Sequence, residues 1–250
     1  MLHWSLTLPT DVANLSAQEI LAWALRTHGK RFALVTSFQA EGMALVDIAA
    51  RLDNSVRVVT LDTGRLPEQT FGMMEAVRER YGLTVEVVFP DAAEVEQMTA
   101  RHGVNLFYND LALRRLCCHV RKTRPLDRKL ADFDCWAAGL RRAQSAERSS
   151  IEKAEIQGGR IKLHPLADWT DQQLQEYLSR HEVPHHPLYA RGYSSIGCAP
   201  CTRAIQAGED SRAGRWWWEQ DASKECGIHV SPEGKVQRTL DVLLDELLIH

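Results

Sequence analysis

The first hundred residues alternate between short apolar runs and longer stretches that carry apolar side chains on one side only. The apolar runs predict buried β-strands over residues 31–37, 56–61 and 84–89. The amphipathic stretches are bounded by Ser, Pro and Gly residues that commonly start or end helices, and they predict helices over residues 16–28, 43–52, 67–81 and 92–102. Because the connections are too long for hairpins, we expect right-handed βαβ units.

The same pattern continues less regularly through the rest of the chain. A fourth strand is expected over Phe133–Gly139, which places Cys135 in the core, and a short strand over Arg160–His164. A helix is expected over Thr170–Arg180 and another over Val236–Leu248. These elements predict an α/β fold: a single domain with a mainly parallel sheet flanked by helices.

Two polar turns follow predicted strands, at Ser37–Gly42 and Asp62–Arg65. Ligands of such sheets bind beyond the carboxyl ends of the strands, and backbone N–H groups at a helix start suit a phosphate or a sulfate. Polar strand-to-helix turns are common, so neither turn is specific by itself.

The bulk composition is that of an ordinary soluble globular protein, with 44% hydrophobic and 25% charged residues. A net charge of −3 argues against a general affinity for nucleic acid or for anionic membranes. No apolar run is long enough to span a bilayer and the N-terminus lacks the features of a signal peptide, so the cytoplasm is the expected location. Basic residues nevertheless crowd one region, which is either a solvated helix face or an anion site: Arg114, Arg115, Arg121, Lys122, Arg124, Arg128, Lys129, Arg141, Arg142 and Arg148.

Six cysteines in a reducing compartment are better explained by metal or redox chemistry than by disulfides. Cys198 and Cys201 form a C-x-x-C pair, and Cys117 and Cys118 form a tandem pair in a basic segment expected to be helical. Four soft ligands fit zinc or an iron–sulfur cluster, and the tandem pair favours the larger cubane because adjacent residues strain to bind one small ion. A thioredoxin-like dithiol at Cys198 is disfavoured by its late position, and two structural cysteines remain the alternative for the tandem pair.

The remaining cysteine, Cys226, lies between Lys224 and His229, with Arg212 and Arg215 a short way upstream. Neighbouring cations lower the pKa of a thiol toward its nucleophilic thiolate form. The alternative is a buried structural cysteine. The flanking charges and an adjacent glycine favour the reactive thiol.

Several motifs together resemble one family, the assimilatory adenylyl-sulfate reductases, which are relatives of the phosphoadenylyl-sulfate reductases. The matching stretches are residues 36–41, 61–65, 117–122, 141–149, 191–203, 214–219 and 224–229. Both cysteine pairs are typical of the family branch with a 4Fe–4S cluster. The resemblance implies a fold of the PP-loop adenine-nucleotide hydrolase type, which is Rossmann-like.

The resemblance also implies a mechanism. Cys226, assisted by His229 and Lys122, would attack the sulfur of adenylyl sulfate, expel AMP and carry a thiosulfonate. Thioredoxin or glutaredoxin would then release sulfite. One 4Fe–4S cluster would be held by Cys117, Cys118, Cys198 and Cys201. The positions implied to bind substrate are Ser37, Phe38, Leu61, Asp62, Thr63, Gly64, Arg65, Arg148, Arg212 and Arg215.

The expected organisation is a nucleotide- and cluster-binding domain over residues 1–205 and a mobile segment over 206–250 that carries Cys226. A homo-oligomer is expected, with the last helix as a candidate contact. Gly42 and Ala143 depart from the family pattern, in which acidic residues are usual.

Three alternatives stay open at this point. In the first, the substrate is phosphoadenylyl sulfate, either alone or in addition to adenylyl sulfate. The chain is a cluster-bearing redox sensor, against which the extra thiol of Cys226 argues. Or it is a zinc-stabilised PP-loop enzyme that activates a substrate with ATP.

Overall fold

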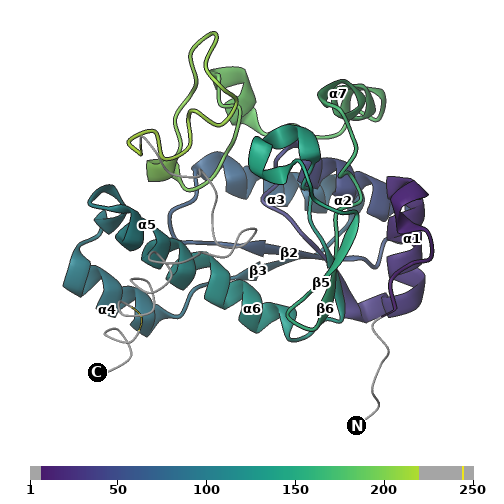
Figure 1. The fold of residues 1–250 in the computed structure, drawn as a ribbon, viewed down its shortest axis with the longest axis horizontal. Coiled ribbons are helices and arrows are strands. Elements are labelled where there is room, and N and C mark those ends of the chain that lie inside the picture. The colour runs from purple at the N-terminus through teal and green to yellow at the C-terminus, as the bar shows by residue number, and fades with distance from the viewer. Residues whose placement is uncertain (1–6, 220–243, 245–250) are drawn as a thin grey trace.

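A six-stranded sheet forms the centre of the computed structural model, which describes residues 7–219 and residue 244 (Figure 1). The strand order is β3-β2-β1-β4-β6-β5. All neighbouring strands run parallel except β5, which pairs with β6 in an antiparallel hairpin at one edge. The strands are β1 (Phe32–Val35), β2 (Arg57–Leu61), β3 (Val85–Val88), β4 (Cys135–Ala137), β5 (Ala154–Gln157) and β6 (Arg160–Leu163).

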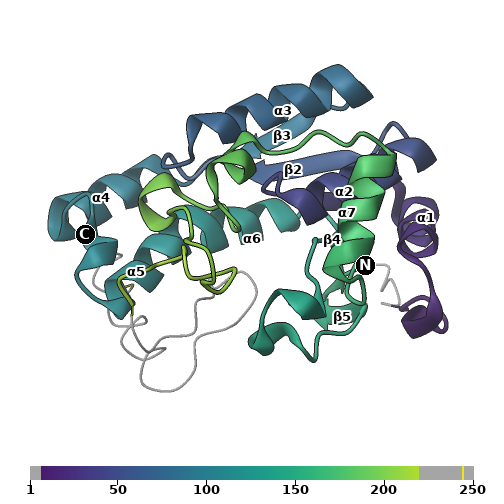
Figure 2. The same ribbon diagram turned by 90° about the horizontal axis from the view of Figure 1, so that it is seen from above.

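Helices cover both faces of this sheet, as Figures 1 and 2 show. The helices are α1 (Ala17–His28), α2 (Ala40–Leu52), α3 (Glu68–Tyr81), α4 (Ala92–His102), α5 (Leu111–Cys118), α6 (Arg124–Leu130) and α7 (Asp171–Arg180). Phe32 and Leu34 point into a large core shared with α1, α2, α3 and α7. Ala33 between them points to the other face, where Leu126 and Leu130 of α6 pack. The alternation of side chains along β1 therefore places a helix layer on each side.

The fold confirms the α/β class and most of the predicted elements. Ser16 caps α1 through a capping box, and α4 covers the predicted residues. Cys135 is fully buried in β4, as expected. Pro67 is the N-cap of α3 rather than its first helical residue, and α2 begins at Ala40, three residues before the predicted start.

Several elements were not predicted, among them α6, the 3₁₀ turns, β5 and a π-helical turn. Strand β5 has three exposed residues among its four, so its hydrophobic pattern is weak. A π-helical turn at His119–Thr123 separates α5 from α6. Such turns are rare in proteins as a whole, but those that occur are often found at functional sites. The helix predicted over Val236–Leu248 lies outside the described residues except for Leu244, which packs against the cluster formed by α4 and α5.

A buried carboxylate joins three of the helices. Asp47 of α2 accepts hydrogen bonds from the hydroxyls of Tyr81 of α3 (3.0 Å) and Tyr177 of α7 (2.7 Å). Arg51 donates to the same carboxylate at 2.8 Å. This network fixes α7, which lines the cavity described below. In the part of the chain that the structure describes, no helix is long and apolar enough to cross a membrane.

Candidate active site

A cavity of about 740 Å³ opens at the carboxyl ends of β1, β2 and β4. Its walls come from the turns that follow these strands, from α7, and from two later segments around residues 185–197 and 211–216. Parallel strands place their carboxyl ends at one edge of a sheet, which explains why distant parts of the sequence meet here. Seven of the predicted site residues line the cavity: Ser37, Leu61, Thr63, Lys122, Arg148, Arg212 and Arg215.

The turn after β1 is built around a buried phenylalanine. Phe38 has a positive φ of 58° and is fully buried in the core, while its backbone N–H donates to the Thr36 hydroxyl at 2.9 Å. Ser37 is left exposed at the cavity, so the anchoring of Phe38 presents its neighbour. A β-carbon on Gly42 would stand 2.1 Å from the Thr36 hydroxyl oxygen. This contact gives a physical reason for the glycine where the family usually has an acidic residue.

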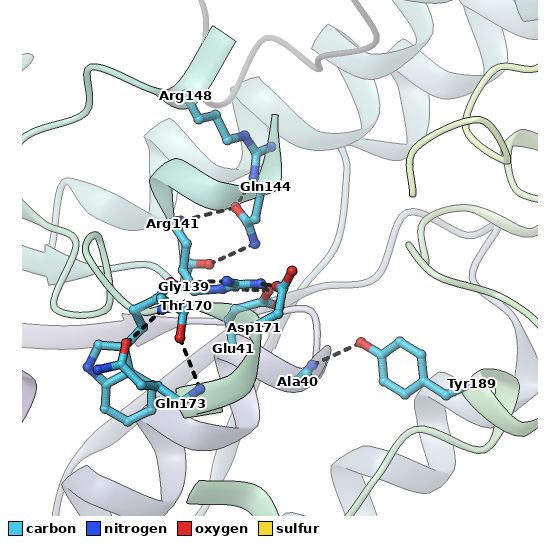
Figure 3. Close-up of polar contacts among 11 residues, drawn as sticks. Ala40, Glu41, Gly139, Arg141, Gln144, Arg148, Thr170, Asp171, Gln173 and Tyr189 are labelled. Atoms are coloured by element: carbon cyan, nitrogen blue, oxygen red, sulfur yellow. Dashed lines mark hydrogen bonds and ion pairs between the residues drawn. The ribbon is translucent and has the colours of Figure 1, made fainter. Parts of the chain in front are cut away.

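The start of α2 is tied to the 187–197 segment by two hydrogen bonds. The backbone N–H of Ala40 donates to the Tyr189 hydroxyl at 3.0 Å, as Figure 3 shows. The Gln39 amide oxygen accepts from the backbone N–H of Ile196 at 2.7 Å. These bonds close one wall of the cavity with residues that lie about 150 positions apart in the sequence.

Only part of the turn after β2 lines the cavity. Thr63 lines it, and its hydroxyl lies 3.3 Å from the sulfur of Cys198. Asp62 accepts from the backbone N–H of Gly64 at 2.8 Å, which stabilises the turn from outside the cavity lining. Arg65 turns away: it donates to the side chain of Asn105 at 2.8 Å and covers the ring of Phe107 at 5.5 Å. Phe38, Asp62, Gly64 and Arg65 are thus predicted site residues that do not line the cavity.

Among the described residues, five lysine or arginine side chains but only two carboxylates line the cavity. Both carboxylates are occupied by one cation, since Arg141 bonds Glu41 at 2.9 Å and Asp171 at 2.7 Å (Figure 3). Lys122, Arg148, Arg212 and Arg215 line the same cavity, so positive charge exceeds negative charge in its lining and the cavity favours an anionic ligand.

Arg148 is nearly buried and is oriented by Gln144. One of its guanidinium N–H groups donates to the Gln144 amide oxygen, which also accepts from the backbone N–H of Arg141 at 3.1 Å. The Gln144 amide nitrogen donates to the carbonyl of Gly139 at 3.3 Å (Figure 3). The Gln144 side chain therefore links Arg148 to the loop after β4.

The four predicted metal ligands lie together beside the cavity. Cys117 and Cys118 end α5, while Cys198 is the N-cap and Cys201 the last residue of a short 3₁₀ turn. All of them belong to one apolar cluster with Leu116 and residues of α4, and Figure 2 shows their two segments side by side. No three His, Cys, Asp or Glu side chains within residues 7–219 are arranged to hold a single metal ion.

The thiols of this cluster differ in their electrostatic setting. Burial and the neighbouring Cys118 raise the pKa of Cys117 to about 12, and burial with Cys198 does the same for the pKa of Cys201, also to about 12. Burial also acts to raise the pKa of Cys198, but Lys122, the Thr63 hydroxyl and Arg215 outweigh it and hold that pKa below its ordinary value. Of these three thiols, Cys198 is therefore the one whose pKa the cavity cations lower most effectively.

A model of the phosphoadenosine phosphosulfate reductase domain matches residues 31–204. The chain belongs to this family. This confirms the resemblance predicted from the motifs. Two relatives, both named adenosine 5'-phosphosulfate reductase, come from Burkholderia cepacia and Allochromatium vinosum. The first is 46% identical over 90% of this chain and 89% of its own length, and the second 43% identical over 89% and 87%.

Solved structures agree with the family assignment. A phosphoadenylyl-sulfate reductase from Candida auris, in a phosphate complex, superposes with a TM-score of 0.65 at 26% identity and covers 76% of this chain and 91% of its own. The FMN adenylyltransferase of Candida glabrata shares the fold alone, with a TM-score of 0.52 at 11% identity over 94% and 82% of the two chains.

The predicted catalytic residues Cys226 and His229 lie outside the described residues, as does Lys224. Other residues of this reductase site went unnoticed in the sequence: Tyr189, Gln144, Trp136, and the ion pairs of Arg141. Arg141 and Gln144 stand within a stretch already matched to the family, so a signal existed. The contacts of Tyr189 and Trp136 depend on the packing of distant segments, which no local pattern encodes.

Proposed function

We propose that the chain reduces adenylyl sulfate to sulfite and AMP in sulfate assimilation, through a thiosulfonate on Cys226. The relatives that cover most of its length are named for this substrate. The thiolate of Cys226 attacks the sulfur of the sulfate group, the sulfur–oxygen bond to AMP breaks, and AMP leaves with the electron pair. His229 and Lys122 are the groups proposed to assist.

The observation that carries this proposal is the cationic cavity built on the carboxyl ends of the strands. Adenylyl sulfate presents a phosphate and a sulfate in one small region, and Lys122, Arg148, Arg212 and Arg215 supply the matching charges. These cations also stabilise the negative charge that develops on the departing AMP phosphate. Ser37, Leu61 and Thr63 are proposed to contact the nucleotide, while Phe38, Asp62 and Gly64 act through the shape of their turns.

The donor set fits a 4Fe–4S cluster. Cys117, Cys118, Cys198 and Cys201 bring four sulfur ligands into one apolar pocket, the number that a 4Fe–4S cluster requires. Lys122 and Arg215 stand close enough to Cys198 to lower its pKa, so they offset the negative charge of a thiolate-bound cluster. When bound, the cluster would supply that negative charge beside the cavity and would cross-link α5 to the 198–201 turn.

A separate dithiol protein, thioredoxin or glutaredoxin, is proposed as the reductant. Its thiolate displaces sulfite from the thiosulfonate, and its second thiol resolves the mixed disulfide. Cys135 does not serve as an internal resolving thiol because it is fully buried in β4, where burial raises its pKa. The cytoplasm keeps such reductants active and is the proposed compartment.

Phosphoadenylyl sulfate is the second candidate substrate, since the solved relative from Candida auris is named for it. Its additional phosphate would need a further cation. Arg141 is engaged by Glu41 and Asp171, which argues against it in that role. Competition between the two nucleotides in one assay separates these candidates.

The test is mass spectrometry of the protein after incubation with adenylyl sulfate and no reductant. We expect one added sulfonate group on Cys226, with no adduct in the Cys226→Ser variant. Cys135→Ser is the matched control and should form the adduct normally. An adduct that maps to Cys135 or Cys198 would refute the assignment.

A further inference from the structure

The guanidinium of Arg215 lies against a glycine that leaves no room for a side chain. A β-carbon on Gly197 would stand 2.4 Å from Nη2 and 2.7 Å from Cζ of Arg215. Gly197 does not have the positive φ that usually requires glycine. Close contact with Arg215 is therefore the physical reason for a glycine at this position.

The guanidinium also packs on an aromatic ring. Its Cζ atom lies 4.6 Å from the ring centroid of Trp216, which is almost completely buried. Arg114 lies 4.3 Å from the same centroid, so two cations share one indole. Trp is the aromatic residue that attracts a cation most strongly.

Trp216 itself is firmly held. Its φ is 40°, a conformation that residues other than glycine rarely adopt and that persists only when the surroundings impose it. Its backbone N–H donates to the carbonyl of Cys201 at 3.2 Å. Arg114 is fully buried and donates two hydrogen bonds to Glu219, at 2.8 and 2.9 Å. Trp216 is thus held against Arg114 of α5 by its ring and to the 198–201 turn by its backbone.

Hydrogen bonds do little to orient Arg215. Within the described residues, Nη1 donates to the Ser195 hydroxyl at 3.3 Å, and the buried Nε has no partner. Packing therefore sets the position of this cation. We propose that Gly197 and Trp216 are positioning residues that aim Arg215 at the anion in the cavity. The inference rests on the proposed function, in which Arg215 binds the charged end of adenylyl sulfate.

The geometry of the contact allows a positioning role of Gly197 to be distinguished from a purely structural one. A methyl group at position 197 would displace only the far end of a flexible side chain, so Gly197→Ala should move the guanidinium and leave the fold intact. Gly214 is different, because a β-carbon there would stand 2.3 Å from the backbone carbonyl oxygen of Arg203. Substitution at Gly214 would disturb the chain itself.

The test measures the dissociation constant of adenylyl sulfate by calorimetry in the full chain with its metal content retained. A Cys226→Ser background prevents reaction. Gly197→Ala should weaken binding about tenfold, the partial loss of a charge-assisted contact. Its unfolding midpoint and iron content should match those of the parent. Gly72→Ala is the matched control, because no atom lies within 4 Å of the added carbon, and it should bind as the parent does.

Trp216 is tested in the same assay. Trp216→Leu should weaken binding, whereas Trp216→Phe should keep most of it, because the phenylalanine ring retains the cation–π contact. Trp217→Leu, at an exposed neighbouring ring, is the control and should have no effect. Equal losses in the Leu and Phe variants would contradict a role through the cation.

The Arg215→Ala background shows whether Gly197→Ala weakens binding through Arg215 or in some other way. With no guanidinium to displace, Gly197→Ala should add nothing in the Arg215→Ala background. An equal loss in both backgrounds would overturn the inference, and so would normal binding by Gly197→Ala when Arg215→Ala binds poorly. Normal binding by Arg215→Ala itself would instead refute the proposed role of Arg215, and the inference with it.

Discussion

Lys122 connects the cavity to the cysteine cluster. It lines the cavity and helps to lower the pKa of Cys198. It reaches both places from the π-helical turn that follows Cys118, where the helix widens before α6 begins. In the proposed function, this single cation compensates charge both on the Cys198 thiolate and on the anion bound in the cavity.

Lys122→Ala should therefore weaken the binding of adenylyl sulfate, and Arg148→Ala should do the same. A charge-assisted contact of this kind contributes roughly 1.5–3 kcal/mol, which is about a 10- to 150-fold change in the dissociation constant. Calorimetry in the Cys226→Ser background measures it. The exposed Lys30 provides the matched control, Lys30→Ala, which should bind normally. If Lys122→Ala and Arg148→Ala both bound like the parent, these basic residues would serve only to balance the charge of the iron–sulfur cluster.

Helix α7 is positioned by the buried hydrogen-bond network around Asp47. Burial acts to raise the pKa of Asp47, but the hydrogen bonds from Arg51, Tyr177 and Tyr81 outweigh it and hold that pKa below its ordinary value. A depressed carboxyl pKa contributes stability that is present at neutral pH and is lost as the pH falls through the folded-state pKa. Here the loss is confined to pH values below about 4, the ordinary value for aspartate.

Tyr177→Phe should lower the free energy of unfolding by about 1.5–3 kcal/mol at pH 7, because it removes a hydrogen bond to a buried carboxylate. Denaturant titrations at pH 7 and at about pH 3.5 measure the difference. The gap from the parent protein should narrow at the lower pH, because Asp47 in the variant lacks one of the hydrogen bonds that lower its pKa and therefore takes up a proton before Asp47 of the parent does. Tyr193→Phe lies outside this network and controls for the loss of a hydroxyl. A gap that widens in acid would contradict the assigned network.

At the level of elements, α5 and the 198–201 turn are joined by the cysteines. Replacing Cys117, Cys118, Cys198 or Cys201 with serine should remove iron and visible colour and should lower the unfolding midpoint, because metal binding is coupled to folding. Elemental analysis and absorbance spectra report both effects. Cys135→Ser should keep the colour. Stoichiometric zinc without iron in the parent protein would show that the cluster assignment is wrong.

Across the whole molecule, the sequence was most informative where its periodicity was strong. Helices α1, α4 and α7 are capped by residue types that are common at helix ends, and β1, β2 and β4 are apolar runs. Strand β5 was missed because a polar edge strand carries little hydrophobic pattern. The π-helical turn was missed because it differs from an α-helix by hydrogen bonding alone.

Only part of the cavity was predictable from the sequence. The turns after β1 and β2 and the basic segment stood out in the sequence, and Ser37, Thr63, Lys122 and Arg148 from these stretches line one cavity. The neutralisation of Arg141 and the packing of Arg215 on Gly197 depend on contacts between distant segments. Whether Cys226 and His229 reach this cavity stays a prediction, since they lie outside the described residues.

In the proposed mechanism, one thiol takes the sulfonate from adenylyl sulfate and a separate protein completes the cycle. Rapid-quench measurement of AMP and sulfite tests it most directly. Without thioredoxin, the parent protein should release about one AMP per active site and no sulfite, because the covalent intermediate accumulates. Sulfite should appear only when reduced thioredoxin is added, and Cys226→Ser should release no AMP. Repeated turnover with protein and substrate alone would contradict the account.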